Sequence, residues 1–218
     1  MQLEQLGIIG LSLAAAAWFF FGLRAIRRRG ETFQRWLKEG VGKQGKLGPA
    51  RWLGPASFGA RLELGEAASL FQVVDFVLWL RRRENLPLWA YQALRRQDEY
   101  FLIQVKMRRP PEAAFAAVRS GDASAHREAG RRKYVLAGSP LSQGSFAVYG
   151  FNHEGKQPLM AQRLFDRLEK AGPTLMCLRV QGEIPHLEVV FKPAVIASSA
   201  SDKLLRDLNK IVEAAVPL

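Results

Sequence analysis

The feature that most constrains this chain is an uncharged apolar stretch near its amino terminus, which runs from Leu6 to Leu23. Its 18 residues would form a helix roughly 27 Å long at about 1.5 Å per residue, close to the ~30 Å hydrocarbon core of a bilayer. The stretch is apolar on every side, unlike a helix that lies on a membrane surface with one polar face. The sequence therefore predicts a short amino terminus and an uncleaved transmembrane anchor within residues 1–23.

A cleaved signal peptide and a buried or peripheral helix are the two alternatives for this stretch. A signal peptide needs a basic segment at its start, and the residues before Leu6 carry no Lys or Arg. Ala14–Ala17 offer small residues for a peptidase, but cleavage there would leave four arginines close to the new amino terminus. Trp18 and Phe19–Phe21 come just before these arginines, where interfacial aromatic residues of a membrane span are found. The pattern therefore favours an anchor.

The distribution of positive charge predicts how the anchor is oriented. The net charge is +12, and one of the two basic blocks, residues 24–51, directly follows the apolar stretch. Positive residues remain on the cytoplasmic side of a span, so we expect the amino terminus outside and the rest of the chain in the cytoplasm. A mitochondrial inner-membrane protein facing the matrix obeys the same rule, and this alternative stays open. The residues expected to contact anionic headgroups or to set the topology are Arg24, Arg27, Arg28, Arg29, Arg35 and Lys38.

Residues 24–55 are predicted to join the anchor to a folded domain. Phe33, Trp36 and Leu37 have the spacing of one helix face, which predicts a basic juxtamembrane helix. Seven Gly and Pro residues between positions 40 and 55 then indicate a flexible linker. Gly40–Leu47 comes close to a phosphate-binding loop, but it lacks the final hydroxyl residue and the flanking strand and helix. A plain linker is therefore expected.

Residues 56–218 are predicted to form a soluble α+β domain with a mainly antiparallel sheet and two or three helices. Alternating or β-branched runs predict strands, and two amphipathic runs predict helices. The predicted strands are 58–64, 70–80, 99–107, 145–151, 174–182 and 186–193, and the predicted helices begin near Pro158 and Ser201. Residues 88–96 fit either a strand or a helix. Residues 112–133 are expected to hold a short helix and a mobile basic loop.

Few residues have the pattern of a chemical site. The three histidines, His126, His153 and His186, are far apart and there is a single cysteine, so no metal-ligand spacing is present and no cofactor is predicted. Cys177 lies within a predicted buried strand and is expected to be structural. Asp75 interrupts an apolar run, and strand alternation is expected to place it on the solvent face, although buried carboxylates often have functional roles.

The predicted function is that of a membrane-tethered binding or scaffold module with a protein partner and no nucleic-acid target. No catalytic residue is assigned, and a non-enzymatic role is expected. Two alternatives stay open: an accessory subunit of a larger membrane complex, and an enzyme whose site is assembled from distant residues around Asp75 or His153. The basic residues predicted as a possible partner surface, or else as a solubilising surface, are Arg81, Arg82, Arg83, Arg131, Arg132 and Lys133.

Overall fold

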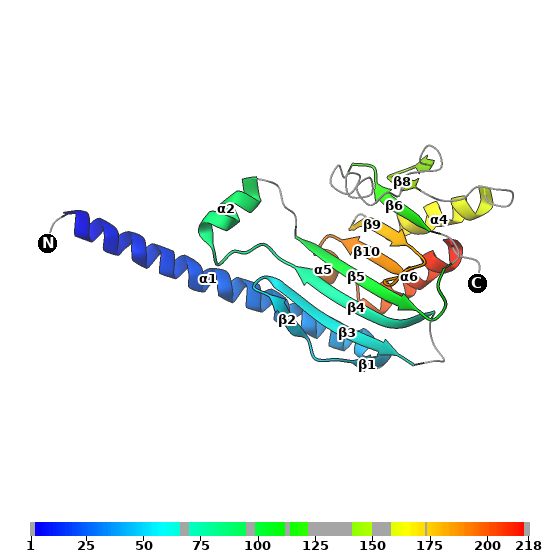
Figure 1. The fold of residues 1–218 in the computed structure, drawn as a ribbon, viewed down its shortest axis with the longest axis horizontal. Helices are drawn as coiled ribbons and strands as arrows, with labels where there is room; N and C mark the ends of the chain where they lie inside the picture. Colours follow the sequence, from blue (N-terminus) through cyan, green and yellow to red (C-terminus); the bar gives the residue numbers. More distant parts are fainter. Residues whose placement is uncertain are drawn as a thin grey trace.

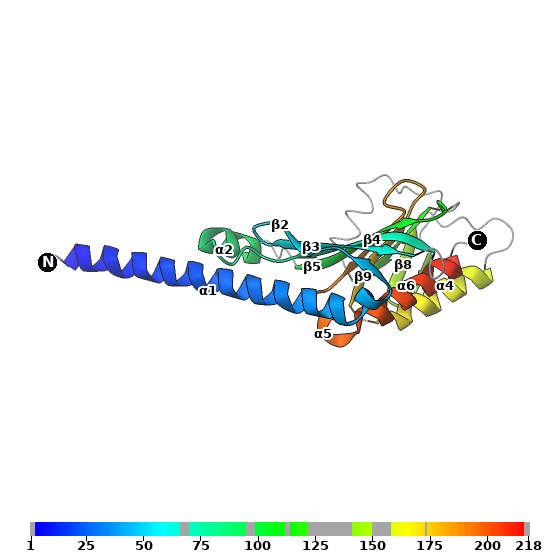
Figure 2. The same cartoon turned by 90° about the horizontal axis from the view of Figure 1, so that it is seen from below.

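The chain folds around one antiparallel sheet whose helices cover a single face (Figure 1, Figure 2). The computed structural model describes residues 3–65, 70–94, 99–111, 114–121, 141–149, 158–172 and 174–215. This architecture confirms the predicted α+β class with a mainly antiparallel sheet. The described part of the chain has five α-helices, slightly more than expected.

The strands follow the order β1-β3-β4-β5-β10-β9-β6-β8-β7, and β2 pairs with the start of β3. Their bounds are β1 Gly45–Leu47, β2 Arg51–Gly54, β3 Ser57–Leu64, β4 Phe71–Trp79, β5 Tyr100–Met107, β6 Phe115–Arg119, β7 Leu141–Gln143, β8 Phe146–Tyr149, β9 Leu175–Val180 and β10 Leu187–Phe191. In β4, Val74, Phe76 and Leu78 are buried, while Asp75 and Val77 between them are half-buried on the other face. The predicted alternation of this strand is therefore confirmed, and it fixes the register, because a one-residue slip would expose the buried side chains.

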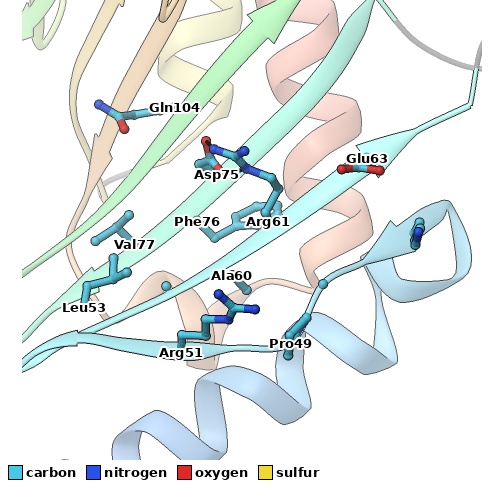
Figure 3. Close-up of a pocket in the computed structure, with 13 residues that line it drawn as sticks. Pro49, Arg51, Leu53, Ala60, Arg61, Glu63, Asp75, Phe76, Val77 and Gln104 are labelled. Carbon is cyan, nitrogen blue, oxygen red and sulfur yellow. Dashed lines mark hydrogen bonds and ion pairs between the residues drawn. The ribbon is translucent and has the colours of Figure 1, made fainter.

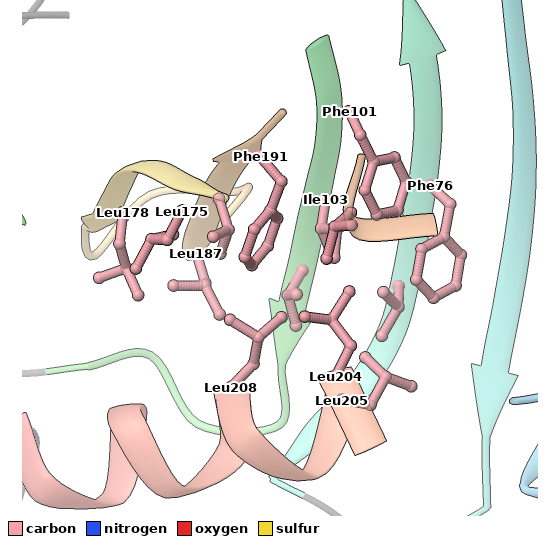
Figure 4. Close-up of a cluster of buried hydrophobic side chains, with 14 of the residues drawn as sticks. Phe76, Phe101, Ile103, Leu175, Leu178, Leu187, Phe191, Leu204, Leu205 and Leu208 are labelled. Carbon is pink, nitrogen blue, oxygen red and sulfur yellow. The ribbon is translucent and has the colours of Figure 1, made fainter. Parts of the chain in front are cut away.

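The described helices are α1 Leu3–Glu39, α2 Leu86–Leu94, α4 Pro158–Lys170, α5 Val195–Ser198 and α6 Ser201–Ala215, with a 3₁₀ turn η1 at Val41–Lys43. All of these helices except α2 contribute buried side chains to the other layer of the core. The predicted stripe of α4 is buried at Leu164, Phe165 and Leu168. Figure 4 shows Leu204 and Leu208 of α6 directed at apolar side chains of the sheet. Both helices are therefore stabilised by packing the apolar side of an amphipathic helix against one face of the sheet.

The carboxyl end of α1 belongs to the same core, which corrects the prediction of a separate juxtamembrane helix. Phe33 and Leu37 are completely buried. The Phe33 ring contacts those of Phe58 and Phe101, with centroids 5.9 and 5.5 Å apart. The helix face recognised from its spacing is therefore a core face. It packs on the sheet of the domain that was expected to begin only at residue 56.

The Gly- and Pro-rich segment after α1 is part of the fold as well, and the predicted flexible linker is wrong. β1 and β2 both pair with β3. At Gly45, a Cβ atom would lie 2.2 Å from the carbonyl oxygen of Glu63, so only glycine allows this approach of two backbones. The glycine content that indicated a linker is thus at least partly a requirement for close strand packing.

The end of α1 is fastened to the start of α6. The Ser201 hydroxyl donates to the carbonyl oxygen of Trp36 at 2.8 Å and accepts from the Val41 N–H at 3.1 Å. The Trp36 indole donates to the Ser199 carbonyl oxygen at 2.6 Å. A Cβ atom at Gly40 would lie 1.9 Å from the Ser201 hydroxyl oxygen. These contacts satisfy backbone groups that a helix end otherwise leaves unpaired.

Two further segments were assigned less well from sequence. Residues 88–96 fitted a strand or a helix, and α2 shows the helix for residues 86–94. The expected short helix within 112–133 is wrong for Phe115–Arg119, which form β6 between β9 and β8. The first four of these residues are buried, so this central strand lacks the polar alternation that reveals a half-buried strand. The mobile basic loop expected within the same range is not described, because residues 122–133 lie outside the described residues.

Candidate functional site

A row of polar side chains crosses the helix-free face of the sheet. By strand register, the residues opposite one another are Arg61, Asp75, Gln104, Glu188 and Arg179, on β3, β4, β5, β10 and β9. The Arg61 guanidinium donates to both carboxylate oxygens of Asp75, at 2.7 and 2.9 Å. Gln104 donates to Glu188 at 3.0 Å, and Arg179 forms an ion pair with the same carboxylate. The face is therefore polar in the middle, with its charges matched in pairs.

This pairing decides what the row can do chemically. The hydrogen bond and the charge of Asp75 raise the pKa of Arg61 above its ordinary value. A carboxylate with both oxygens engaged by one guanidinium serves as a structural ion pair, and its geometry does not offer a free base. Asp75 stands on the solvent-facing side of β4, as strand alternation predicted. The row is suited to recognition through charge and hydrogen bonds.

A groove of about 550 Å³ includes three residues of this row, Arg61, Asp75 and Gln104, in its lining (Figure 3). Its charged lining includes Arg51, Arg61 and Glu63, and its apolar lining includes Leu53 and Val77. Figure 3 shows that these side chains come from β2, β3 and β4. The groove exists because β1 and β2 pair with β3, so the residues expected to form a linker build one of its walls.

A second row on the same face is apolar. Val77, Leu102 and Val190 are opposite one another in the register of β4, β5 and β10. Near this row, the rings of Trp79 and Tyr100 stack with centroids 5.8 Å apart, and burial raises the pKa of Tyr100. Cys177 continues the row on β9 and is buried, as predicted for a structural cysteine. An apolar strip beside matched charges, with aromatic residues at its end, is the composition of many protein interfaces.

A cluster of arginines surrounds Glu99 where α1 passes the ends of β4 and β5. Arg29 forms an ion pair with Glu99, and Arg83 approaches the same carboxylate at 3.4 Å. The backbone N–H of Arg81 donates to it at 3.4 Å. Burial acts to raise the pKa of Glu99, but the contacts with Arg29, Arg81 and Arg83 outweigh it and leave that pKa below its ordinary value. A groove of about 750 Å³ borders the cluster.

The structure distributes the residues predicted as basic sites over several places. Arg24, Arg27 and Arg28 are exposed on α1, and so are Arg35 and Lys38 farther along it. Arg81 and Arg83 meet Arg29 at Glu99, which brings together two predicted sets, while Arg82 forms an ion pair with Glu84. Sequence reasoning missed this because Arg29 and Glu99 are 70 positions apart. Arg131, Arg132 and Lys133 lie outside the described residues.

The histidines give no metal centre in the part of the chain that the structure describes. His186 is buried, and its Nδ1 accepts a hydrogen bond from the Met107 N–H at 3.0 Å. His126 and His153 lie outside the described residues. Among the described residues, no group of three or more His, Cys, Asp or Glu side chains could hold a metal ion. The role shown for His186 is to order the end of β5.

The amino-terminal part of α1 stands apart from the sheet, and its described side chains from residue 5 to residue 21 are exposed. This helix is long and apolar enough to cross a membrane. No known protein family and no curated protein matches the chain.

Proposed function

We propose that the protein is a membrane-anchored binding platform, in which α1 fixes the sheet at a set orientation to the bilayer and the helix-free face binds a protein partner. The observation that carries this proposal is the double nature of α1. It is one continuous helix from Leu3 to Glu39, exposed and apolar at its start and buried in the core at Phe33 and Leu37. Such a helix is both anchor and structural element.

The exposed part of α1 supports the membrane role. Leu11, Phe20 and Phe21 are each about 70% exposed, at 75, 68 and 73%. A contiguous apolar surface of this kind marks a membrane or protein contact, because leaving it in water costs free energy in proportion to its area. Cleavage at Ala14–Ala17, the signal-peptide alternative, would still leave Trp18 and the following phenylalanines exposed on the retained helix. A retained span gives all of these side chains an apolar environment.

The arginines that follow the apolar stretch support one orientation. In the proposal, Arg24, Arg27 and Arg28 lie at the cytoplasmic or matrix-side headgroups and the amino terminus lies on the opposite side. Arg35 is twelve residues beyond Leu23, or roughly 18 Å along a helix at about 1.5 Å per residue. That exceeds a Debye length of about 8 Å in physiological salt. The lipid contact is therefore assigned to the first arginines, and Arg35 and Lys38 contribute little to it.

The binding role is assigned to the helix-free face. Its polar row, apolar row and aromatic stack offer a partner both specificity and apolar area. Because α1 enters the core without a flexible linker, this face has a fixed direction relative to the membrane. A partner would meet it at a defined height and angle, which is what a scaffold contributes.

The proposal is tested by photo-crosslinking in native membranes. A crosslinking amino acid is placed at Leu102 on the helix-free face, and a matched one at Lys203, an exposed position on α6. We expect a discrete partner adduct from position 102 that disappears when Val190→Glu is added, and none from position 203. Equal adducts from both positions, or none from position 102, would contradict a binding role for this face.

A further inference from the structure

The short helix α2 has no role in the core, yet it has the composition of a core helix. Its nine residues, LPLWAYQAL, carry no charge, and none of them is buried. Leu94 is 85% exposed, and Leu86 and Tyr91 are about half exposed. Asn85 begins the helix by accepting the Leu88 N–H at 3.0 Å on its side-chain oxygen. An apolar helix that is well capped but left outside the core requires some other apolar surroundings.

The position of α2 along α1 indicates what those surroundings are. The Trp89 ring lies 5.4 Å from the Trp18 ring, between centroids. Trp18 is five residues before Leu23, the last residue of the uncharged stretch, and thus roughly 7 Å inside it along the helix axis. Amphipathic helices that lie in the plane of a membrane bury their apolar side about 5–10 Å into the boundary between headgroups and acyl chains. In α2 the polar groups are Tyr91 and Gln92, and the basic residues Arg81–Arg83 come just before the helix. Figure 1 shows α2 beginning close to α1 and leading away from it at a steep angle, outside the sheet.

The segment before α2, residues 81–85, lies where the headgroup layer of the bilayer would be. At Gly22, a Cβ atom would lie 2.5 Å from the Arg83 carbonyl oxygen, so this backbone rests directly on α1 one residue before the uncharged stretch ends. Arg83 is therefore level with the end of the uncharged stretch, and Arg81, through Glu99, lies toward Arg29 farther along α1. The exposed arginines 24, 27 and 28 follow on α1 itself. Arg82 and Arg83 form ion pairs with Glu84 and Glu99. The exposed arginines on α1 therefore supply most of the positive charge that complements an anionic headgroup layer.

We propose that α2 is an in-plane membrane helix that lies in the headgroup–acyl boundary of the bilayer crossed by α1, with Arg81–Arg83 at the level of the lipid phosphates. This inference depends on the proposed span of α1. It adds a second contact with the same membrane, and two contacts fix the rotation of the domain about the axis of α1, which a single helix leaves free. The lipid surface is chosen over a protein partner because α2 is continuous with the exposed apolar surface of α1.

The test measures depth in the membrane with single spin labels on the full-length chain in vesicles of phosphatidylcholine and phosphatidylglycerol. Labels are placed by Leu94→Cys on α2, Leu11→Cys in the proposed span and Lys210→Cys on α6, each in a Cys177→Ala background. Oxygen concentrates in lipid, whereas a nickel chelate stays in water. We expect the ratio of oxygen to nickel collisions at positions 94 and 11 to exceed that at position 210 several-fold.

Three other outcomes would overturn the inference. Water-like collisions at position 94 with lipid-like collisions at position 11 would leave the anchor intact and remove α2 from the membrane. A label at position 94 shielded from both reagents would assign α2 to a protein contact. Water-like collisions at both positions would contradict the span itself, and with it the proposed function.

A second measurement avoids the cysteine background. In vesicles containing lipids brominated near the top of the acyl chains, Trp89→Phe should lower the lipid-quenched part of the tryptophan emission. Trp52→Phe, a matched change at an exposed tryptophan that lies against Gly30 of α1, should leave that part unchanged. Equal quenched emission in the natural chain and in Trp89→Phe would place Trp89 outside the lipid.

Discussion

Phe33 shows how one side chain decides whether α1 is a tether or part of the domain. Its ring is fully buried and contacts Phe58 on β3, Phe101 on β5 and Trp36 on its own helix. A tether would leave this ring in water or lipid. The side chain instead couples α1 to the centre of the sheet.

Replacing Phe33 with alanine should therefore destabilise the whole domain. Removal of a buried phenylalanine side chain typically costs about 3–5 kcal/mol, because apolar burial is lost and a cavity remains. Arg35→Ala, two residues away at an exposed position, should change stability by about 0.5 kcal/mol or less. Denaturant unfolding of the detergent-solubilised chain, followed by circular dichroism, measures both. Equal stabilities for the two variants would contradict a core role for α1 and indicate that it is only a tether.

The ionisation of Glu99 makes the stability of the fold depend on pH. Because its pKa is lower in the folded state, its contacts with Arg29 and Arg83 stabilise the fold fully above the ordinary value of 4.5, and this contribution is lost as the pH falls through the lowered pKa. We expect Glu99→Gln to flatten the loss of stability on acidification below 4.5. Glu183→Gln changes an exposed glutamate between β9 and β10. In this variant, stability below pH 4.5 should fall as steeply as in the natural chain. Melting temperatures across an acid series measure this difference.

Among single residues, those defined by local periodicity were predictable. The inward set Val74, Phe76 and Leu78 follows from a period of two along one strand. The cluster at Glu99 was not predictable, because it joins α1 to β5 across 70 positions. Pairing over such distances is set by the path of the chain in three dimensions, and one sequence carries no local signal of it.

Among the elements, strongly patterned helices and strands were recognised and the short strands β1, β2 and β6 were not. α6 shows an unbroken apolar stripe, and β4 alternates cleanly. β6 is buried on both faces and short, so its composition resembles a helix as much as a strand. β1 and β2 consist of three and four residues, too few to show a period, and their glycines dominated the prediction.

The packing of α2 on α1 provides a test at the scale of elements. Gly22→Ala would bring a methyl group against the Arg83 backbone and should push the segment from Arg81 to Leu94 away from α1. Gly10→Ala introduces the same change on the same helix, with no heavy atom within 4 Å of the new Cβ. Hydrogen exchange of residues 81–94 in nanodiscs should become faster in the first variant and stay unchanged in the second. Equal exchange in both variants would contradict the close contact.

At the scale of the whole molecule, the fold class was predictable, but the boundary between anchor and domain was not. The sequence suggested a domain that begins at residue 56. In the structure, deletion of residues 1–55 would remove Phe33, Leu37 and Val41 from the core, together with β1 and β2. The physical reason for the error is that a helix face looks the same whether its apolar side chains meet lipid, a partner or the body of the chain itself.

Two fragments test whether the folded domain begins at residue 56 or includes the carboxyl end of α1. A fragment beginning at Arg24 retains the buried part of α1 and should unfold cooperatively. A fragment beginning at Ala56 lacks that part of the core and should be aggregated or molten, with weak near-ultraviolet circular dichroism. A soluble, cooperatively folded fragment 56–218 would show that the helix contributes little to the core.

The central claim is that one rigid helix leaves the membrane and enters the core of the sheet. Hydrogen exchange of the full chain in lipid nanodiscs tests it most directly at residues 24–32, between the apolar stretch and Phe33. Rigidity predicts that these amides are protected to the same extent as those of β4 and β5, because opening them requires opening the domain. Exchange at the rate of an unstructured chain in this segment, with the flanking parts of α1 still protected, would show a hinge and contradict the claim.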